Sequence, residues 1–369
     1  MAARGITKSG SSPSGRASLG SSGGACAAVE YNSSEPPTSR ETMGYVIGDA
    51  SSNDTGDPRN RPGVTKTRAF VIGVGLVGGS IAMALRASGR YEVNGFDVNP
   101  VSLRRAVECG ALDGAADSLG GAREADIVLV ATPLLAMPQV FAELGRCLKD
   151  GDARRAQSLP VVTDVGSAKC YVLALAREHL APVVPFVGGH PMAGSETSGV
   201  DHASPDMVRG CLYVLTPAEW TSEAAVRVVA RACEAAGSIP SIMDPADHDA
   251  MVAATSHLPL IIAACLARVV EERSVGLPSI WDLAASGFRD TTRLASGDPE
   301  MGTGMLVANA ARILDAMDDF QRKFDEVRAL VAASADTSPA SCVDMARRFL
   351  AEARASRQAW LERTRFPAI

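Results

Sequence analysis

Three glycines form the first segment of this chain whose residue types and spacing could carry chemistry. Gly73, Gly75 and Gly78 make the pattern G-x-G-x-x-G between an apolar run at residues 69–72 and a stretch with helical periodicity. Glycines there would permit a tight turn, a close approach of the backbone to a pyrophosphate, and close packing of the helix on the strand. The positive helix N-terminus would attract phosphates, so the pattern predicts a dinucleotide site.

Asp97 indicates which dinucleotide would bind. It follows a second predicted strand, residues 91–96, at about the separation from the glycines that a ribose-binding acid has in such sites. A carboxylate there accepts hydrogen bonds from ribose hydroxyls and repels a 2′-phosphate, which favours NAD over NADP. The alternative is an ordinary glycine turn with a surface acid. The residues predicted to bind the cofactor are Gly73, Gly75, Leu76, Val77, Gly78, Asp97 and Thr132.

Two further segments could supply proton chemistry at strand ends. Residues 164–169 read Asp-Val-Gly-Ser-Ala-Lys, in which Ser167 could orient a base and Lys169 could attract an anion. Equally, Ser167 could cap a helix while Lys169 is solvated. His190 lies among glycines and small residues that leave space beside its ring. Because histidine titrates near neutrality, we interpret His190 as a catalytic base rather than a structural residue.

Polar segments of the C-terminal half could face the same site. His257 lies in Thr-Ser-His-Leu-Pro, just after Asp-His-Asp at residues 247–249, and could line an active site or be a satisfied core residue. Arg293 ends the segment Gly-Phe-Arg-Asp-Thr-Thr-Arg. Its guanidinium suits a carboxylate, because it donates two parallel hydrogen bonds. The alternative for this segment is a surface ion pair with Asp290.

Strands and helices must bring these segments together. Predicted strands at residues 69–72, 91–96, 127–131, 161–165 and 183–187 alternate with helical stretches. This alternation predicts an α/β fold, a Rossmann-type doubly wound parallel sheet covered on both faces. Residues 250–272, 278–285, 304–330 and 341–364 read as helices. We therefore expect a disordered Ser/Gly-rich tail at residues 1–66, an NAD-binding domain at 67–245 and a helical domain at 246–369.

The composition limits the class of function and the compartment. The chain has 36 Lys+Arg against 42 Asp+Glu and no basic cluster, which argues against nucleic acid as a partner. Its eight cysteines show no C-x-x-C spacing, so no metal site is expected, and the absence of a secretory signal favours the cytoplasm. The residues before Glu30 leave an organellar transit peptide as the alternative. The apolar stretch 251–270 contains His257 and Arg268, so we expect a helix buried in a soluble core or in a dimer interface, and no membrane span.

Taken together, these segments resemble the prephenate/arogenate dehydrogenase family of tyrosine biosynthesis. The matching stretches, in the family's order, are residues 71–80, 164–169, 188–199, 248–259 and 287–293. The resemblance implies a Rossmann domain followed by a helical dimerisation domain, NAD as cofactor and a homodimer. It also implies oxidative decarboxylation of prephenate, with arogenate as the alternative substrate.

The resemblance assigns roles residue by residue. His190 matches the catalytic histidine that hydrogen-bonds the ring hydroxyl, and Ser167 matches a serine that contacts the same hydroxyl and the nicotinamide. Arg293 matches the arginine that grips a substrate carboxylate. Glu196 matches an acidic gate residue that pairs with this arginine. The implied substrate-binding residues are Arg293, His257, Glu196 and Asp290.

The chain departs from the family's pattern at three positions, one of which is Gly304, where an acid is common. Leu260 stands where a second histidine is common, and Gly302 stands where a tryptophan is frequent, which leaves the pocket's shape open. A β-hydroxyacid dehydrogenase is a weaker alternative, because that group usually uses a lysine that residues 245–300 lack. A catalytically inactive dinucleotide sensor would be expected to lack His190 or Arg293, and both are present.

Overall fold

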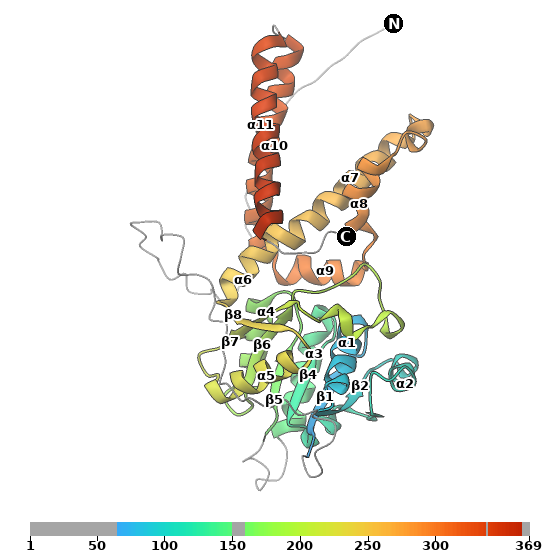
Figure 1. The fold of residues 1–369 in the computed structure, drawn as a ribbon, viewed down its shortest axis with the longest axis vertical. Helices are drawn as coiled ribbons and strands as arrows, with labels where there is room; N and C mark the ends of the chain where they lie inside the picture. Colours follow the sequence, from blue (N-terminus) through green and yellow to red (C-terminus); the bar gives the residue numbers. More distant parts are fainter. Residues whose placement is uncertain (1–64, 150–158, 337–338, 364–369) are drawn as a thin grey trace, which may run out of the picture. The chain divides into compact units, whose positions relative to one another are not determined.

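The computed structural model describes residues 65–149, 159–336 and 339–363. The tail expected at residues 1–66 lies outside these ranges except for its last two residues. Within the described residues, an eight-stranded sheet comes first in the chain and a series of helices follows it (Figure 1).

The sheet has the strand order β3-β2-β1-β4-β5-β6-β7-β8. Every neighbouring pair is parallel except β6 and β7, which are antiparallel. The prediction of a doubly wound parallel sheet is therefore confirmed, apart from this one reversal. The strands are β1 (Thr67–Ile72), β2 (Tyr91–Phe96), β3 (Gly114–Ala115), β4 (Ile127–Val130), β5 (Val161–Asp164), β6 (Phe186–Pro191), β7 (Leu212–Pro217) and β8 (Ile239–Ile242).

Helices cover both faces of the sheet. Successive side chains of each strand point to opposite faces, so each face carries apolar side chains that a layer of helices buries. Val71 and Leu129 belong to one buried cluster, whereas their neighbours Ile72 and Val130 belong to the other. The first cluster includes side chains of α1 (Leu76–Ala87), α2 (Pro100–Glu108) and α5 (Glu223–Ala235), and the second includes side chains of α3 (Met137–Lys149) and α4 (Lys169–His179). Because β1, β4, β5 and β6 are parallel neighbours, their carboxyl ends meet along one edge of the sheet.

The strand that carries His190 lies later in the chain than the sequence pattern predicted. Residues 183–187 were expected to be a strand, but β6 begins at Phe186 and continues to Pro191. Val184 still belongs to the turn after α4, where its amide donates to the Leu180 carbonyl. His190 is therefore inside a strand, opposite Val214 of β7, rather than in the loop beyond one.

The helices after the sheet begin with a long, interrupted one. α6 (Pro245–Val252) passes through a π-helical turn (Ala253–His257) into α7 (Leu258–Ser274). A 3₁₀ turn (Pro278–Trp281) and α8 (Ser286–Thr292) follow, so the segment at residues 287–293 is mostly helical rather than a polar link. The remaining helices are α9 (Pro299–Ala308), α10 (Ala310–Asp336) and α11 (Pro339–Arg363).

Asn309 divides one predicted helix into two. The pattern at residues 304–330 predicted a single helix, but α9 ends at Ala308 and α10 starts at Ala310. Asn309 is buried, and its side chain forms hydrogen bonds with partners outside both helices. The break thus places a polar side chain within the helical region.

The connection between sheet and helices is short. β8 ends at Ile242, and α6 begins at Pro245 with Asp244 as its N-cap, which accepts from two backbone amides. The boundary predicted after residue 245 falls in the first turn of this helix. α6 packs against α4, so the helical segment contacts the sheet domain beside β5 and β6.

Candidate active site

The glycine loop follows β1 and opens α1. Gly73 has φ +90°, and a Cβ there would lie 2.6 Å from the Ala131 carbonyl oxygen, so the position requires glycine. A side chain at Gly78 would collide with the Gly73 carbonyl. Gly75, in contrast, faces open space. α1 has no capping side chain and no acid in its first turn, so its amides are available to an anion.

Asp97 is tied to this loop by hydrogen bonds. Its Oδ2 accepts from the Val74 amide at 2.9 Å and its Oδ1 from the Asn99 amide at 2.8 Å. Each carboxylate oxygen retains a lone pair that could accept from a ribose hydroxyl. Thr132 packs against Gly73, and its buried Oγ1 has no partner among the described residues. The open loop and this unpartnered hydroxyl fit a dinucleotide.

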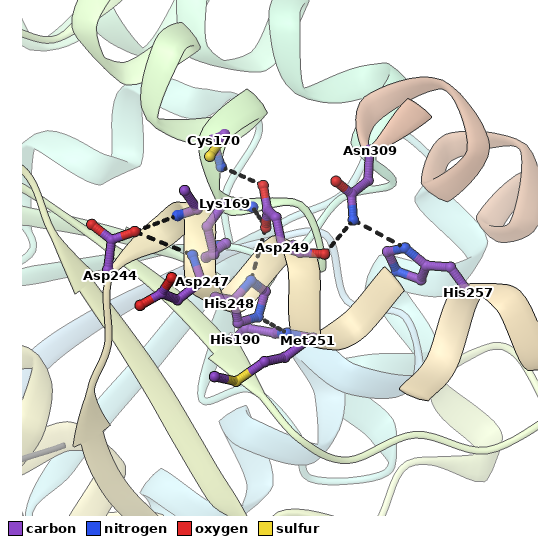
Figure 2. A network of polar contacts seen from close by, with 12 residues as sticks. Lys169, Cys170, His190, Asp244, Asp247, His248, Asp249, Met251, His257 and Asn309 are labelled. Atoms are coloured by element: carbon purple, nitrogen blue, oxygen red, sulfur yellow. Dashed lines mark hydrogen bonds and ion pairs between the residues drawn. The ribbon is translucent and has the colours of Figure 1, made fainter. Parts of the chain in front are cut away.

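His190 of β6 forms one end of a chain of polar side chains (Figure 2). Its Nδ1 lies 2.8 Å from Nε2 of His248, and Nδ1 of His248 lies 2.8 Å from Oδ1 of Asp249. His248 and Asp249 are buried and come from α6. His190 Nε2 has no hydrogen-bond partner among the described residues, so this nitrogen is available to a ligand.

Burial keeps His190 uncharged. Burial lowers the pKa of its imidazole well below the ordinary value, and His248, Lys169 and His257 lower it further. The ring is therefore neutral at pH 7 and able to accept a proton. This electrostatic environment suits a general base.

Lys169 pairs with a carboxylate inside the sheet domain instead of facing a ligand anion. Its ammonium is completely buried and donates to Asp164 Oδ2 and to the Gly189 carbonyl, both at 2.5 Å. Asp164 also accepts the amides of Gly166 and Gly189. The structure thus contradicts both suggestions for Lys169, anion binding and solvation, because its donors hold β5 and β6 together next to the base.

His257 lies in the π-helical turn and is also uncharged. Burial lowers its pKa to about 4, although Asp249 opposes the shift. Its Nδ1 lies 3.3 Å from Nδ2 of Asn309, which also donates to the Asp249 carbonyl at 2.9 Å. His257 Nε2 is buried without a partner in the described part of the chain. A buried, unpartnered polar atom of this kind fits a ligand better than a satisfied core.

Arg293 and Glu196 form an ion pair, as the resemblance implied. Arg293 Nη1 lies 3.3 Å from Glu196 Oε2, and Glu196 lies in the loop after β6. Asp290 pairs instead with Arg289 at 2.9 Å and is mostly exposed. The structure therefore does not bring Asp290 to Arg293.

Ser167 lies between β5 and α4, at the same sheet edge as the His190 strand. Ala168 rather than Ser167 is the N-cap of α4, so the helix-capping alternative is wrong. The Ser167 hydroxyl makes no hydrogen bond within the described ranges. Its position leaves it available for a substrate or cofactor contact.

Two of the departures from the family's pattern, Leu260 and Gly302, lie side by side. A Cβ at Gly302 of α9 would lie 3.5 Å from Cδ2 of Leu260 in α7, which is an ordinary contact distance. A leucine and a glycine therefore occupy the place where the resemblance suggested a histidine and a tryptophan.

The sequence pattern predicted that the polar run at residues 247–249 could face the site, but it gave His248 and Asp249 no individual role and did not single out Asn309. A signal existed for the first two, because an acid–His–acid run on an otherwise apolar helix needs a polar partner. Nothing in the local pattern marked Asn309, whose partners are 52 and 60 residues away. Over the described residues, no group of three or more His, Cys, Asp or Glu side chains is placed to hold a metal ion.

Two family models match successive parts of the chain. The model described as prephenate dehydrogenase, nucleotide-binding domain, matches residues 81–239. The model described as prephenate dehydrogenase, dimerization domain, matches residues 244–341. Together they cover the sheet from α1 onward and the helices through the start of α11.

The chain is also similar to individual proteins of this kind. The chain is 34% identical over 268 residues to a prephenate dehydrogenase of Bacillus subtilis (strain 168), which is 72% of this chain and 70% of that protein. A crystal structure of prephenate dehydrogenase from A. aeolicus in complex with hydroxyphenyl propionate and NAD⁺ is 27% identical, with TM-score 0.70 over 80% of this chain and 99% of the other. Synechocystis arogenate dehydrogenase is 29% identical, with TM-score 0.65 over 80% and 100%.

Proposed function

Because this chain belongs to the prephenate dehydrogenase family, we propose that it is an NAD-dependent prephenate dehydrogenase. The reaction is the oxidative decarboxylation of prephenate to 4-hydroxyphenylpyruvate in L-tyrosine biosynthesis. The observation that carries the proposal is that the His190 imidazole is neutral and uses only one of its two ring nitrogens in a hydrogen bond. Its Nδ1 is bound to His248, while its Nε2 remains free at the sheet edge that also carries the glycine loop.

The cofactor would be held by the glycine loop and its neighbours. The α1 amides beside Gly75 would bind the pyrophosphate, and Asp97 would accept from the ribose hydroxyls. Thr132 Oγ1 would gain the partner it lacks. Leu76 and Val77, half-buried in the first turn of α1, would line the same cradle. When bound, NAD⁺ supplies the hydride acceptor.

His190 would move the proton of the reaction. Its Nε2 accepts the proton of the substrate's ring hydroxyl while hydride leaves the carbon that bears this hydroxyl. When the ring carboxylate then departs as CO₂, the electrons of the broken carbon–carbon bond make the ring aromatic. His190 can return its proton to the resulting phenolate oxygen, so that it ends the cycle neutral. Ser167 would hold the same oxygen in place.

The substrate's charges require cations and donors. A substrate carboxylate would replace Glu196 as the partner of Arg293. Glu196 would act as a gate residue, because it occupies Arg293 until the substrate binds. His257 Nε2, buried and unpartnered, would face the substrate. Asp290 would brace this region through Arg289. Holding a dianion against the nicotinamide by such contacts supplies much of the rate by positioning.

An absorbance assay tests the proposal directly. The purified full chain is mixed with NAD⁺ and either prephenate or arogenate, and NADH formation is followed at its absorbance maximum. Turnover of prephenate with NAD⁺ supports the proposal. Failure to reduce NAD⁺ or NADP⁺ with either substrate contradicts it.

Arogenate is the second candidate substrate. The likeness to the Synechocystis arogenate dehydrogenase matches that to the prephenate enzyme of A. aeolicus in extent and identity. Arogenate carries an amino group where prephenate carries a keto group, and Glu196 is a half-exposed carboxylate that could pair with an ammonium. The ratio of kcat/KM for the two substrates in the same assay decides between them.

The proposed assembly is a homodimer through the helices. The segment Pro245–Ser274 is long and apolar enough to cross a membrane, and 22% of its most apolar window is buried. Large apolar side chains that are exposed on the helical region include Val269, Val275, Leu277, Leu283, Leu306 and Val307. A second copy of the chain would remove this surface from water without a membrane. Light scattering after gel filtration should give twice the monomer mass.

The proposed compartment is the cytoplasm. All seven described cysteines are free thiols, which suits a reducing environment. Imaging of the full chain with a fluorescent protein fused to its C-terminus would separate this location from the organellar alternative. The latter depends on residues before Glu30, outside the described ranges.

A further inference from the structure

We infer that His248 and Asp249 form a positioning pair that holds His190 in the neutral tautomer able to accept a proton at Nε2. The inference rests on the proposed function, because it concerns the base of that reaction. Its basis is one continuous hydrogen-bonded chain, Asp249 Oδ1 to His248 Nδ1 and His248 Nε2 to His190 Nδ1 (Figure 2).

The fixed end of the chain is the Asp249 carboxylate. Its Oδ1 accepts the Lys169 amide at 2.6 Å, and its Oδ2 accepts the Cys170 amide at 2.8 Å. Burial raises the pKa of Asp249, but the hydrogen bonds from His248 and the two amides outweigh burial, so the pKa is lowered overall. Asp249 is therefore ionised and can only accept hydrogen bonds.

The direction of each bond follows from this acceptor. His248 Nδ1 must carry the hydrogen that points at Asp249, so in the neutral ring Nε2 keeps its lone pair. His190 Nδ1 must then carry the hydrogen that points at His248, and His190 Nε2 is left with its lone pair. This is the nitrogen that the reaction needs as a proton acceptor. With His190 in the opposite tautomer, Nε2 would be a donor and could not serve.

A purely structural role for Asp249 accounts for only part of the arrangement. The N-cap of α4 is Ala168, which offers no side-chain oxygen, and Asp249 supplies one from α6. Capping explains the two amide contacts. It does not require a buried histidine at position 248, nor the edge-to-face placement of the rings of His190 and His248, whose centroids are 5.0 Å apart.

Two substitutions at position 248 separate the roles. His248→Phe keeps a planar ring but removes the acceptor for His190 Nδ1–H. His248→Gln retains an acceptor, because the glutamine side-chain oxygen can take the place of Nε2. With prephenate or arogenate and NAD⁺, we expect kcat of the Phe variant to fall on the order of 10²-fold, the lower range for loss of a general base. We expect KM to change less than about twofold, and the Gln variant to recover most of the turnover.

Asp247→Asn serves as the matched control. Asp247 is an exposed acid in the same turn of α6, outside the hydrogen-bonded chain, so its replacement should leave kcat unchanged. If the Gln variant is as impaired as the Phe variant while both remain folded, or if KM alone changes, the inference is wrong.

The tautomers can also be observed without turnover. Long-range ¹H–¹⁵N spectra of the full-length protein distinguish protonated from bare ring nitrogens in its five histidines. We expect His190 and His248 to carry hydrogen on Nδ1 and to have bare Nε2 nitrogens at pH 7. Hydrogen on His190 Nε2 would overturn the inference even if the variants lose activity. An inactive wild-type protein with the expected tautomers would refute the proposed reaction and leave the positioning pair standing.

Discussion

Arg293 Nη1 lies 3.3 Å from Glu196 Oε2, so an ion pair joins the turn after α8 to the loop after β6. The side chains are 58% and 46% exposed. An ion pair in that setting contributes little to stability and is screened by salt. Glu196 can therefore be exchanged for another carboxylate at small cost in free energy, which is what a substrate-binding arginine needs.

Arg293→Gln should weaken substrate binding. A hydrogen bond to a charged group is worth about 1.5–3 kcal/mol, so KM for the substrate should rise about 10- to 100-fold while kcat changes only a few-fold. Steady-state kinetics at saturating NAD⁺ measure both. Arg227→Gln, at an exposed arginine of α5 that pairs with Glu223, should leave KM unchanged. An unaltered KM in the Arg293 variant would contradict its assignment.

His190→Asn should have the opposite effect on the two constants. Asparagine fills part of the space but cannot take up a proton, so kcat should fall about 10²- to 10⁴-fold with KM little changed. His202→Asn is the control, because His202 is exposed in the loop between β6 and β7. If His190→Asn mainly raises KM and Arg293→Gln mainly lowers kcat, the two roles are reversed.

Asp97→Ser should erode the preference for NAD⁺. Serine removes the charge that would repel a 2′-phosphate and one acceptor for the ribose hydroxyls. The ratio of kcat/KM with NAD⁺ to kcat/KM with NADP⁺ should fall about tenfold or more. Since Asp97 also accepts the Val74 amide, thermal unfolding should be measured on the same variant. An unchanged ratio in a folded variant would exclude the ribose role.

The buried imidazole of His257 should make the free energy of unfolding depend on pH. The unfolded chain takes up a proton on this residue below about pH 6.5, but burial lowers its pKa in the folded chain to about 4. The contribution of His257 to the free energy of unfolding is therefore complete above pH 6.5. It is lost progressively as the pH falls from 6.5 to about 4, with roughly 2 kcal/mol lost at pH 5.

The corresponding measurement compares His257→Gln with the parent chain. Urea unfolding at pH 7 and pH 5 should show a smaller loss of unfolding free energy in the variant, since the contribution of His190 is common to both proteins. His202→Gln, at an exposed site, should behave like the parent. Equal losses in all three proteins would show that His257 is not the group that titrates.

The nucleotide-binding half could be predicted because its signals are local. The glycine loop after β1 and the position of Asp97 after β2 can each be recognised from a few neighbouring residues. The β6 strand could not be placed in the same way, because Gly188 and Gly189 have no side chain to signal burial. Their strand conformation depends on distant partners: a Cβ at Gly189 would lie 2.6 Å from the Asp164 carbonyl oxygen.

Other differences have equally specific causes. β7 has an apolar sequence, Leu-Tyr-Val-Leu, that could have been assigned as a strand. The link from β6 to β7 contains only two short 3₁₀ turns and no crossover helix, consistent with the antiparallel pairing. The break at Asn309 is different in kind, because its partners Asp249 and His257 belong to other helices. No periodicity within residues 304–330 contains that information.

The cap that Asp249 provides for α4 has a consequence for how the protein opens. Since α4 belongs to the sheet domain and its cap belongs to α6, a fragment ending at residue 245 would leave the first amides of α4 without their acceptor. Native-state hydrogen exchange should accordingly protect the Lys169 and Cys170 amides only while the helical segment is docked. We therefore expect the first turn of α4 to open together with α6, although α4 belongs to the sheet domain and α6 to the helical segment.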